Sequence, residues 1–279
     1  MIAIFKLSWY TIVMVNLGND EIVKYPFLAE AGKYLSDKGF SLDQFGTDPD
    51  LKKIVDNAFE RIITSSEGRI FKSDPLSNNS ALPLEIFSFL IAVILLKLSG
   101  MNTLIRRFSL AEARRAEKFL EKDLMNHQDA TKTKLSLQIL QELFSVTVEK
   151  IDEEFTISVS DYLKHSINFH EREWKLINRK VTNGKVHLTP HETVRLVRKE
   201  LDRHIYTKIN SSSTPEMIIG FETYVDKLKQ LAKKFEVKTV ESKEFPPCIK
   251  HAIEVLEKGE NLPHSGRFLL ATFLLNKGQ

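Results

Sequence analysis

The stretch that decides the fold runs from Glu173 to Glu192 and reads EWKLINRKVTNGKVHLTPHE. Two runs of alternating apolar and polar residues lie on either side of Asn183-Gly184, which is typical of two half-buried strands. An Asn-Gly pair supplies the positive φ values that a type I′ turn requires. The stretch therefore predicts a β-hairpin.

A strand before the hairpin and a helix after it complete a small unit. Phe155 to Val159, FTISV, alternates apolar and polar residues and is rich in β-branched side chains, so it predicts a further strand. Thr189, Pro190 and Glu192 supply an N-cap, a first-turn proline and a capping-box glutamate for a helix that we expect to end near Ile209. The sequence thus predicts a small α+β subdomain.

The rest of the chain has the periodicity of amphipathic helices, with apolar residues three and four positions apart. Asp48 is suited to be an N-cap before Pro49, and Gly100 is a stop signal. A loop rich in Ser, Asn and Pro is expected from Ser73 to Pro83, and a linker from Asn210 to Thr214. Helices are expected at Tyr25–Leu35, Pro49–Ile63, Leu84–Leu98, Thr103–Leu124, Leu135–Phe144 and Pro215–Phe235.

Two apolar stretches could be read as membrane-targeting segments. Met1 to Val15 is followed by no small-residue cleavage site, so we do not read it as a signal peptide, and Met14 leaves open that residues 1–13 come from a misplaced start. Leu84 to Leu98 has only 15 residues and includes Glu85 and Lys97, so it is too short to span a bilayer. We expect a buried core helix there and no membrane partner.

Composition bounds the possible functions. The 279 residues carry 40 Lys and Arg against 37 Asp and Glu, and the net charge of +3 permits nucleic-acid contact without requiring it. The single cysteine, Cys248, excludes an intramolecular disulfide framework and fits a reducing compartment. No glycine-rich phosphate loop, His-Glu-x-x-His pair or Gly-x-Ser-x-Gly elbow is present. The sequence therefore shows no self-contained active site, although dispersed carboxylates would leave weaker traces.

Three groups of segments follow one another in an order that one family shares. Leu104 to Leu120, LIRRFSLAEARRAEKFL, is an arginine-containing helix, and residues 161–165 (DYLKH) and 174–197 lie in the α+β unit. Residues 246–278 open with Pro-x-Cys and continue through a helix to His-x-Gly-Arg and an apolar helix. Together they resemble the N-terminal domain and the start of the iron–sulfur domain of the archaeal and eukaryotic DNA primase large subunit. The resemblance covers about Tyr25 to Gly278.

The resemblance implies a role for Cys248. In this family the matching cysteine is the first of four thiolate ligands of a [4Fe–4S] cluster. Because the chain contains no other cysteine, we expect either a fragment or a lineage that has lost the cluster, and no cluster on this chain alone. Taken by itself, Cys248 would also fit a small buried residue at a helix N-terminus.

The resemblance also implies nucleic-acid and partner residues. The family uses the residues that match His264 and Arg267 to bind nucleic acid or the 5′ triphosphate of the primer, and a guanidinium near exposed N–H groups suits a phosphate. Arg267 could equally be a solvated charge. Tyr162 and Trp174 are expected to be core residues or to face a partner, as interface aromatics do. Solvated faces are expected for Lys24, Arg106, Arg107 and Arg114.

The function that the resemblance implies is that of a regulatory, non-catalytic subunit in DNA replication. It would dock the catalytic small subunit through the α+β unit to form a heterodimer, and it would assist initiation of an RNA primer on a DNA template. The small subunit would hold the catalytic carboxylates and metal ions, and the location would be intracellular, in the cytoplasm or at the nucleoid in an archaeon. Two other classes stay open: a nucleic-acid-binding or helical scaffold protein unrelated to primase, and an enzyme with dispersed carboxylates.

The expected fold class is mainly α, with a helical domain, a small inserted α+β subdomain made of an antiparallel hairpin plus a helix, and a helical C-terminal part. The expected ranges are an N-terminal extension at 1–20, the helical domain at 21–154, the α+β subdomain at 155–209, a linker and charged helix at 210–244, and a truncated start of the iron–sulfur domain at 245–279.

Overall fold

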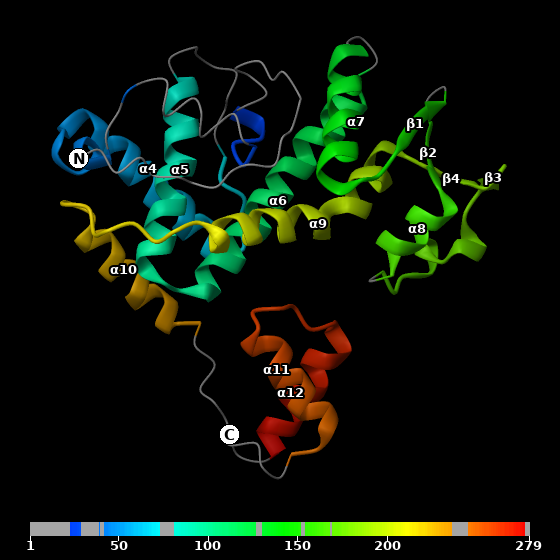
Figure 1. The fold of residues 1–279 in the computed structure, drawn as a ribbon. Coiled ribbons are helices and arrows are strands. Elements are labelled where there is room, and N and C mark those ends of the chain that lie inside the picture. Colours follow the sequence, from blue (N-terminus) through cyan, green and yellow to red (C-terminus); the bar gives the residue numbers. More distant parts are fainter. Residues whose placement is uncertain are drawn as a thin grey trace.

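The computed structural model describes residues 23–28, 39, 42–72, 81–126, 130–151, 154–167, 169–235 and 245–276. These residues form ten α-helices and one four-stranded antiparallel sheet (Figure 1), so the predicted fold class, mainly α with a small α+β part, is confirmed. None of the helices that the structure describes combines the length and the apolar composition of a membrane span.

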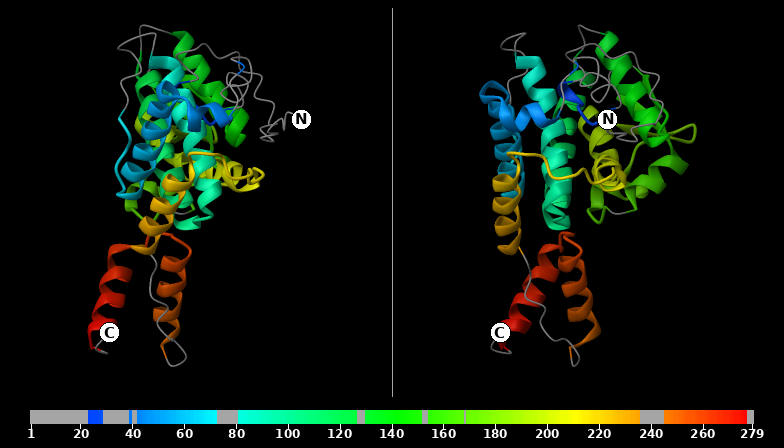
Figure 2. Two further views of the ribbon diagram at one scale, coloured as in Figure 1. Left: turned by 90° about the vertical axis from the view of Figure 1, so that its left-hand side faces the viewer. Right: turned by 60° about the vertical axis from the view of Figure 1, so that its left-hand side comes forward.

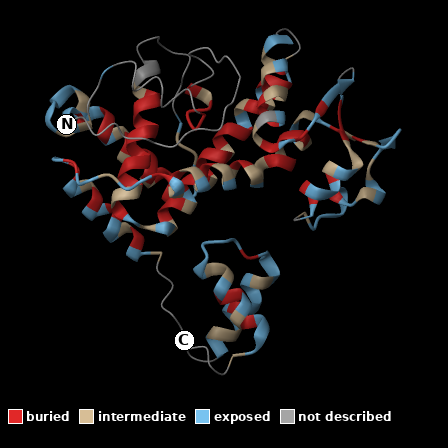
Figure 3. Cartoon of the chain, viewed as in Figure 1, coloured by how far each residue is buried: buried red, intermediate tan, exposed pale blue. Residues whose placement is uncertain are grey.

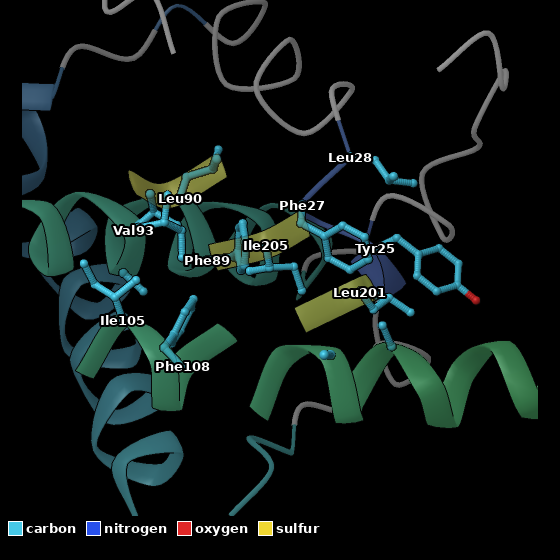
Figure 4. Close-up of a cluster of buried hydrophobic side chains, with 14 of the residues drawn as sticks. Tyr25, Phe27, Leu28, Phe89, Leu90, Val93, Ile105, Phe108, Leu201 and Ile205 are labelled. Carbon is cyan, nitrogen blue, oxygen red and sulfur yellow. The ribbon is translucent and has the colours of Figure 1, made fainter. Parts of the chain in front are cut away.

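A group of helices surrounds the central helix α5, Ala81–Ser99. Every residue from 85 to 96 is buried, which fits a helix that is apolar on all sides and confirms the predicted core helix. Figure 3 shows α5 as an almost unbroken buried element, and Figure 4 shows Phe89, Leu90 and Val93 in one cluster with Ile105 and Phe108. The surrounding helices are α3 Leu42–Thr47, α4 Pro49–Ser66, α6 Asn102–Leu124 and α10 Glu222–Lys233, and α7 Ala130–Phe144 packs on α6.

Local signals place several helix ends as predicted. The Asp48 side chain accepts a hydrogen bond of 2.8 Å from the Asp50 N–H, which caps α4, and Gly100 follows α5 with φ +66°. The helix expected at Tyr25–Leu35 is wrong in its first part, because residues 25–28 form a turn in which the Leu28 N–H donates to the Tyr25 carbonyl. Pro26 disfavours helical geometry for the residue before it. Residues 29–35 lie outside the described residues.

Four charged side chains are buried together in the helical group. Arg61 of α4 donates to Glu112 of α6 at 2.7 Å and to Glu85 of α5 at 2.8 Å, and Arg115 donates to the same Glu85 oxygen at 2.8 Å. The Arg61 side chain is 0% exposed and that of Glu112 is 2% exposed. The network therefore ties α4, α5 and α6 together through charges that water does not reach.

The α+β unit contains the predicted hairpin. Its strands are β1 Val148–Ile151, β2 Glu154–Ser158, β3 Val181–Thr182 and β4 Lys185–Leu188, in the spatial order β1-β2-β4-β3. Asn183 and Gly184 have φ values of 50° and 74°, as a type I′ turn requires, so the hairpin turn is confirmed. The short helix α8, Val159–Ser166, follows β2, and α9, Pro190–Ser211, begins with the predicted capping box at Thr189 and Glu192.

Three segments differ from the prediction for reasons of packing. The alternating run before β3 forms two 3-10 turns, η1 Arg172–Trp174 and η2 Leu176–Asn178, because Trp174 turns into the unit and stacks on Phe169. Pro83 lies inside the first turn of α5 rather than in a loop, which is a position where its missing N–H costs little. Strand β1 was not predicted, because of its four residues only Val148 is buried.

The charged helix also starts later than predicted, since residues 215–221 precede α10. Gly220 has φ +90° and lies so close to Gly46 that a Cβ built on Gly46 would lie 1.7 Å from the Ile219 carbonyl oxygen. This backbone contact leaves no room for a Cβ at either position, and the positive φ of Gly220 excludes a helix at residues 219–221.

Helix α9 joins the α+β unit to the helical group (Figure 1). Its first half contacts α8 and the strands, and it runs antiparallel along α6. His191 lies 3.0 Å from Glu121, Arg198 lies 3.5 Å from Glu117, and the Arg106 guanidinium stacks on the Tyr206 ring at 4.5 Å. One continuous helix therefore fixes the sheet relative to α6.

His204 of α9 provides a pH-dependent contribution to stability. Its ring packs edge-on against Phe27 at 6.3 Å, and burial, together with the nearby Lys208 charge, lowers its pKa to about 4. The unfolded chain binds this proton near pH 6.5, so this group's contribution to stability is lost as pH falls from about 6.5 to 4. Asp202 acts in the opposite sense, because burial raises its pKa to about 6 and the folded chain then binds more protons below that pH.

We expect His204→Phe to remove the pH-dependent contribution of His204 and to leave that of Asp202 in place. As the pH falls from 7 to 4, the free energy of unfolding of this variant should rise by about 2–3 kcal/mol relative to that of the wild type. The measurement is urea denaturation at both pH values. The control is His251→Phe, which makes the same substitution at an exposed position of the C-terminal hairpin. A constant difference for His204→Phe would contradict this account.

Candidate functional site

Large apolar side chains on the surface of the α+β unit are the first candidate for a binding surface. Ile177 of η2 is 91% exposed, and Ile167, at the end of α8, is 74% exposed. Leu163 lies one helical turn before Ile167 and is 49% exposed, so the two share a face of α8. Val181 and Ile151, on the two edge strands, are 45% and 46% exposed. Leu163 and Ile167 are neighbours on α8, and contiguous exposed apolar groups are typical of surfaces that a partner covers.

Tyr162 and Trp174 lie beneath this surface and not on it. Tyr162 is 0% exposed and Trp174 is 3% exposed, and the Tyr162 hydroxyl donates to the Trp174 carbonyl oxygen at 2.9 Å. The stacked ring of Phe169 completes this small core. The structure thus gives both aromatics the role of core residues that hold α8 against the turns carrying Ile177.

The C-terminal part forms a helical hairpin of α11, Pro247–Glu257, and α12, His264–Asn276 (Figure 2). The two helices pack through their own small apolar cluster, and Phe245 meets Phe273 edge-on at 5.1 Å. The cluster consists of Ile249, Ala252, Ile253, Leu262 and Leu270.

Cys248 is exposed in the first turn of α11, rather than being a small buried residue. A [4Fe–4S] cluster takes four cysteine ligands, and this sequence supplies one. Among the described residues no three or more His, Cys, Asp or Glu side chains are grouped so that they could hold a metal ion. The residues of this chain therefore do not by themselves fit the cluster.

His264 and Arg267 lie together in the first turn of α12, and both are exposed. The Arg267 N–H donates to the Pro263 carbonyl at 3.0 Å, so the earlier N–H groups of this turn precede the first intrahelical bond. The structure brings these two residues together but separates them from Cys248. Cys248 lies at the Phe273 end of the hairpin, about 14 Å along α12 from His264 by the rise of a helix.

The loop that leads to His264 approaches α6. A Cβ built on Gly259, which has φ +70°, would lie 2.7 Å from Cδ of Arg106. The end of the hairpin that carries His264 and Arg267 therefore faces the helical group in this structure (Figure 2).

Three of the cations expected on solvated faces have structural partners, and one of them is Arg106, which stacks on Tyr206 at 4.5 Å. Lys24 forms an ion pair of 2.9 Å with Asp123 and its side chain is only 11% exposed. Arg107 donates to the Ser66 carbonyl at 2.8 Å and stacks on Phe235 at 4.1 Å. Amphipathic periodicity could not show this, because the partners come from distant parts of the chain.

Comparison with known protein families finds two matches. Residues 99–217 match the family described as eukaryotic and archaeal DNA primase, large subunit N-terminal domain. Residues 238–279 match the C-terminal domain of the same large subunit.

Curated relatives give the same result along most of the chain. The chain is 31% identical to the DNA primase large subunit PriL of Methanosarcina acetivorans, over 93% of this chain and 69% of the relative. It is 30% identical to the PriL of Methanocella arvoryzae, over 91% of this chain and 68% of the relative. It is 31% identical to the PriL of Methanococcoides burtonii, over 94% of this chain and 73% of the relative. The chain thus spans roughly two thirds of the length of these relatives.

Proposed function

The chain belongs to the large-subunit family of eukaryotic and archaeal DNA primases, and from this premise we propose that it is the non-catalytic subunit that docks the primase small subunit and assists primer initiation. Because the chain belongs to this family, the alternative of a scaffold protein unrelated to primase is excluded. In the proposed complex, the small subunit holds the carboxylates and metal ions of nucleotidyl transfer, and this chain binds it beside the DNA template and the RNA primer.

The observation that carries the docking proposal is the set of exposed apolar side chains on the α+β unit. Five large apolar residues of this unit are at least 45% exposed, and Ile177 and Ile167 are the most exposed of them. Burying apolar surface contributes about 25 cal/mol for each Å² removed from water, so covering such side chains favours association. Tyr162 and Trp174 are buried and hold α8, which carries Leu163, against the turns that carry Ile177.

The test is co-purification of this chain with a primase small subunit, using point substitutions in place of a deletion. Removing residues 155–209 would take away α9, which packs along α6, and would unfold more than the docking surface. Substitutions of exposed side chains avoid this problem. Their expected effects are given in the Discussion.

The contribution to initiation is one of positioning. Starting a primer requires two nucleotides to be held together on a template, and a subunit that binds them supplies part of the entropy cost of bringing them together. His264 and Arg267 are the residues that we propose for this role. Arg267 has no ion-pair partner among the described residues, and its guanidinium lies in a helical first turn where N–H groups favour an anion.

We expect Arg267→Ala, in the complex with the small subunit, to lower de novo dinucleotide synthesis about tenfold. Extension of a supplied primer should change far less, because nucleotide addition belongs to the partner's active site. His264→Ala should act in the same direction but more weakly. The assays compare dinucleotide synthesis with primer extension in the same preparation.

The matched control is Lys258→Ala, which removes an exposed cation of the same hairpin and should affect neither assay. Equal loss of initiation and extension for Arg267→Ala would indicate an undocked or misfolded subunit. Unchanged initiation in Arg267→Ala would show that Arg267 is a solvated surface charge without a role in initiation.

A further inference from the structure

A cationic cleft of about 560 Å³ lies between the end of α4, the loop after it and α6. Arg69 and Lys72 of the loop and Arg114 and Lys118 of α6 line it, against one carboxylate, that of Glu60. Phe71 belongs to the same lining, and its ring lies over the buried Arg61 guanidinium at 5.4 Å. The cleft therefore has an excess of positive charge around a concave surface, with an aromatic ring in its wall.

Three of these cations form no ion pair with a carboxylate among the described residues. Arg69 pairs with Glu67, whereas Lys72, Arg114 and Lys118 form no ion pair there. Arg114 is half-buried, and a carboxylate that interacts with its charge, that of Asp202 on α9, lies outside the cleft lining. Like charges held around a low-dielectric cleft raise the local concentration of anions.

The spacing of the cations suits a chain of phosphates better than a single anion. Arg114 and Lys118 are one helical turn apart on α6, which places them roughly 6 Å apart along the axis. Each strand of a nucleic acid carries one phosphate per ~3.4 Å of duplex axis, so two such side chains can reach phosphates one or two nucleotides apart. Lys72 approaches from the facing loop and can contact the same strand from the other wall.

We propose that this cleft binds the phosphate backbone of a single-stranded nucleic acid, at a site separate from His264 and Arg267. Single-strand sites combine a cationic groove with aromatic side chains against which bases stack, and Phe71 supplies such a ring. The choice of a nucleic acid rests on the proposed function. Binding by the chain alone requires no small subunit, so failure of docking and failure of this cleft are separate results.

The test is titration of a fluorescein-labelled 12-nucleotide oligo-dT with the full chain over a series of salt concentrations. The variant Lys72→Gln/Arg114→Gln/Lys118→Gln removes the three unpaired cations. The control Lys229→Gln/Lys233→Gln/Lys234→Gln removes three exposed cations at α10, so both proteins lose the same net charge. Circular dichroism and urea denaturation check that both are folded.

We expect the cleft variant to bind at least about tenfold more weakly than the control at 0.1 M salt. The slope of log K against log salt should also become shallower by about 2, since each lost phosphate contact changes it by ~0.7. Equal weakening by both triple variants would show that only net charge matters and would overturn the proposal, as would wild-type binding by the cleft variant.

Two further measurements separate other sources of the anion. Displacement of the oligonucleotide by equimolar inorganic phosphate or free nucleoside triphosphate would show a site for a free phosphate and would overturn the assignment to a strand. A cleft variant that keeps oligonucleotide binding but loses the small subunit would show an acidic protein surface as the occupant, which would also overturn it.

Discussion

Replacing Ile167 and Ile177 together with aspartate is expected to weaken binding of the primase small subunit about 1,000-fold, which corresponds to roughly 4 kcal/mol. Each substitution exchanges an exposed apolar group for a carboxylate that the interface would have to bury without a partner, and a central interface position typically contributes 2 kcal/mol or more. At micromolar concentrations such a loss removes the complex from a co-purification assay. Titration by calorimetry gives the magnitude.

The fold should tolerate this double variant, because both side chains point into solvent in the free chain, at 74% and 91% exposure. The matched control is Met217→Asp/Ile219→Asp, which places the same two charges on exposed apolar positions outside the α+β unit. We expect this control to bind normally. Normal binding by Ile167→Asp/Ile177→Asp would place the docking surface elsewhere, and equal loss in both variants would indicate a general effect of added negative charge.

Arg61→Met is expected to reduce the free energy of unfolding by about 3–5 kcal/mol. The Met side chain has a similar length, so packing is largely kept, but Glu112 and Glu85 lose their hydrogen-bonded cation inside the helical group. A buried carboxylate without a partner is far more costly than the pair is stabilising. Urea denaturation followed by circular dichroism gives the difference.

Two further variants test whether the loss of stability in Arg61→Met arises from leaving buried carboxylates without a partner. Arg69→Met removes an arginine from a surface pair with Glu67, where the side chain is 66% exposed, and should cost less than about 1 kcal/mol. Adding Glu112→Leu to Arg61→Met should restore at least half of the loss, because the orphaned charge is then removed. A further loss in the double variant would show that packing, rather than charge, dominates at Arg61.

The sequence predicted best those elements whose causes are local. The turn at Asn183-Gly184 and the capping box at Thr189 depend on a few adjacent residues, and both are present as predicted. The two 3-10 turns before β3 were missed because an alternating pattern shows which residues are apolar but not what buries them. Trp174 is buried by Tyr162 and Phe169, which come from an earlier part of the unit.

The candidate surfaces were less predictable for a related reason. Ile167 and Ile177 look like ordinary core residues in the sequence, and only the fold shows that they are 74% and 91% exposed. The cationic cleft combines a loop after α4 with α6, more than 40 positions later, so no local pattern contains it. His264 and Arg267, by contrast, lie three positions apart in one helical turn and were found together from the motif alone.

Helix α9 has a mechanical consequence. It is 22 residues long, about 33 Å by the rise of a helix, and it contacts α6 along most of this length, from His191 with Glu121 to Tyr206 with Arg106. A rotation of α9 by 5° about its C-terminal end would move its N-terminal end, which carries the sheet, by about 3 Å. The orientation of a partner bound to the α+β unit is therefore set by side-chain contacts between α9 and α6, such as the ion pair of Arg198 with Glu117.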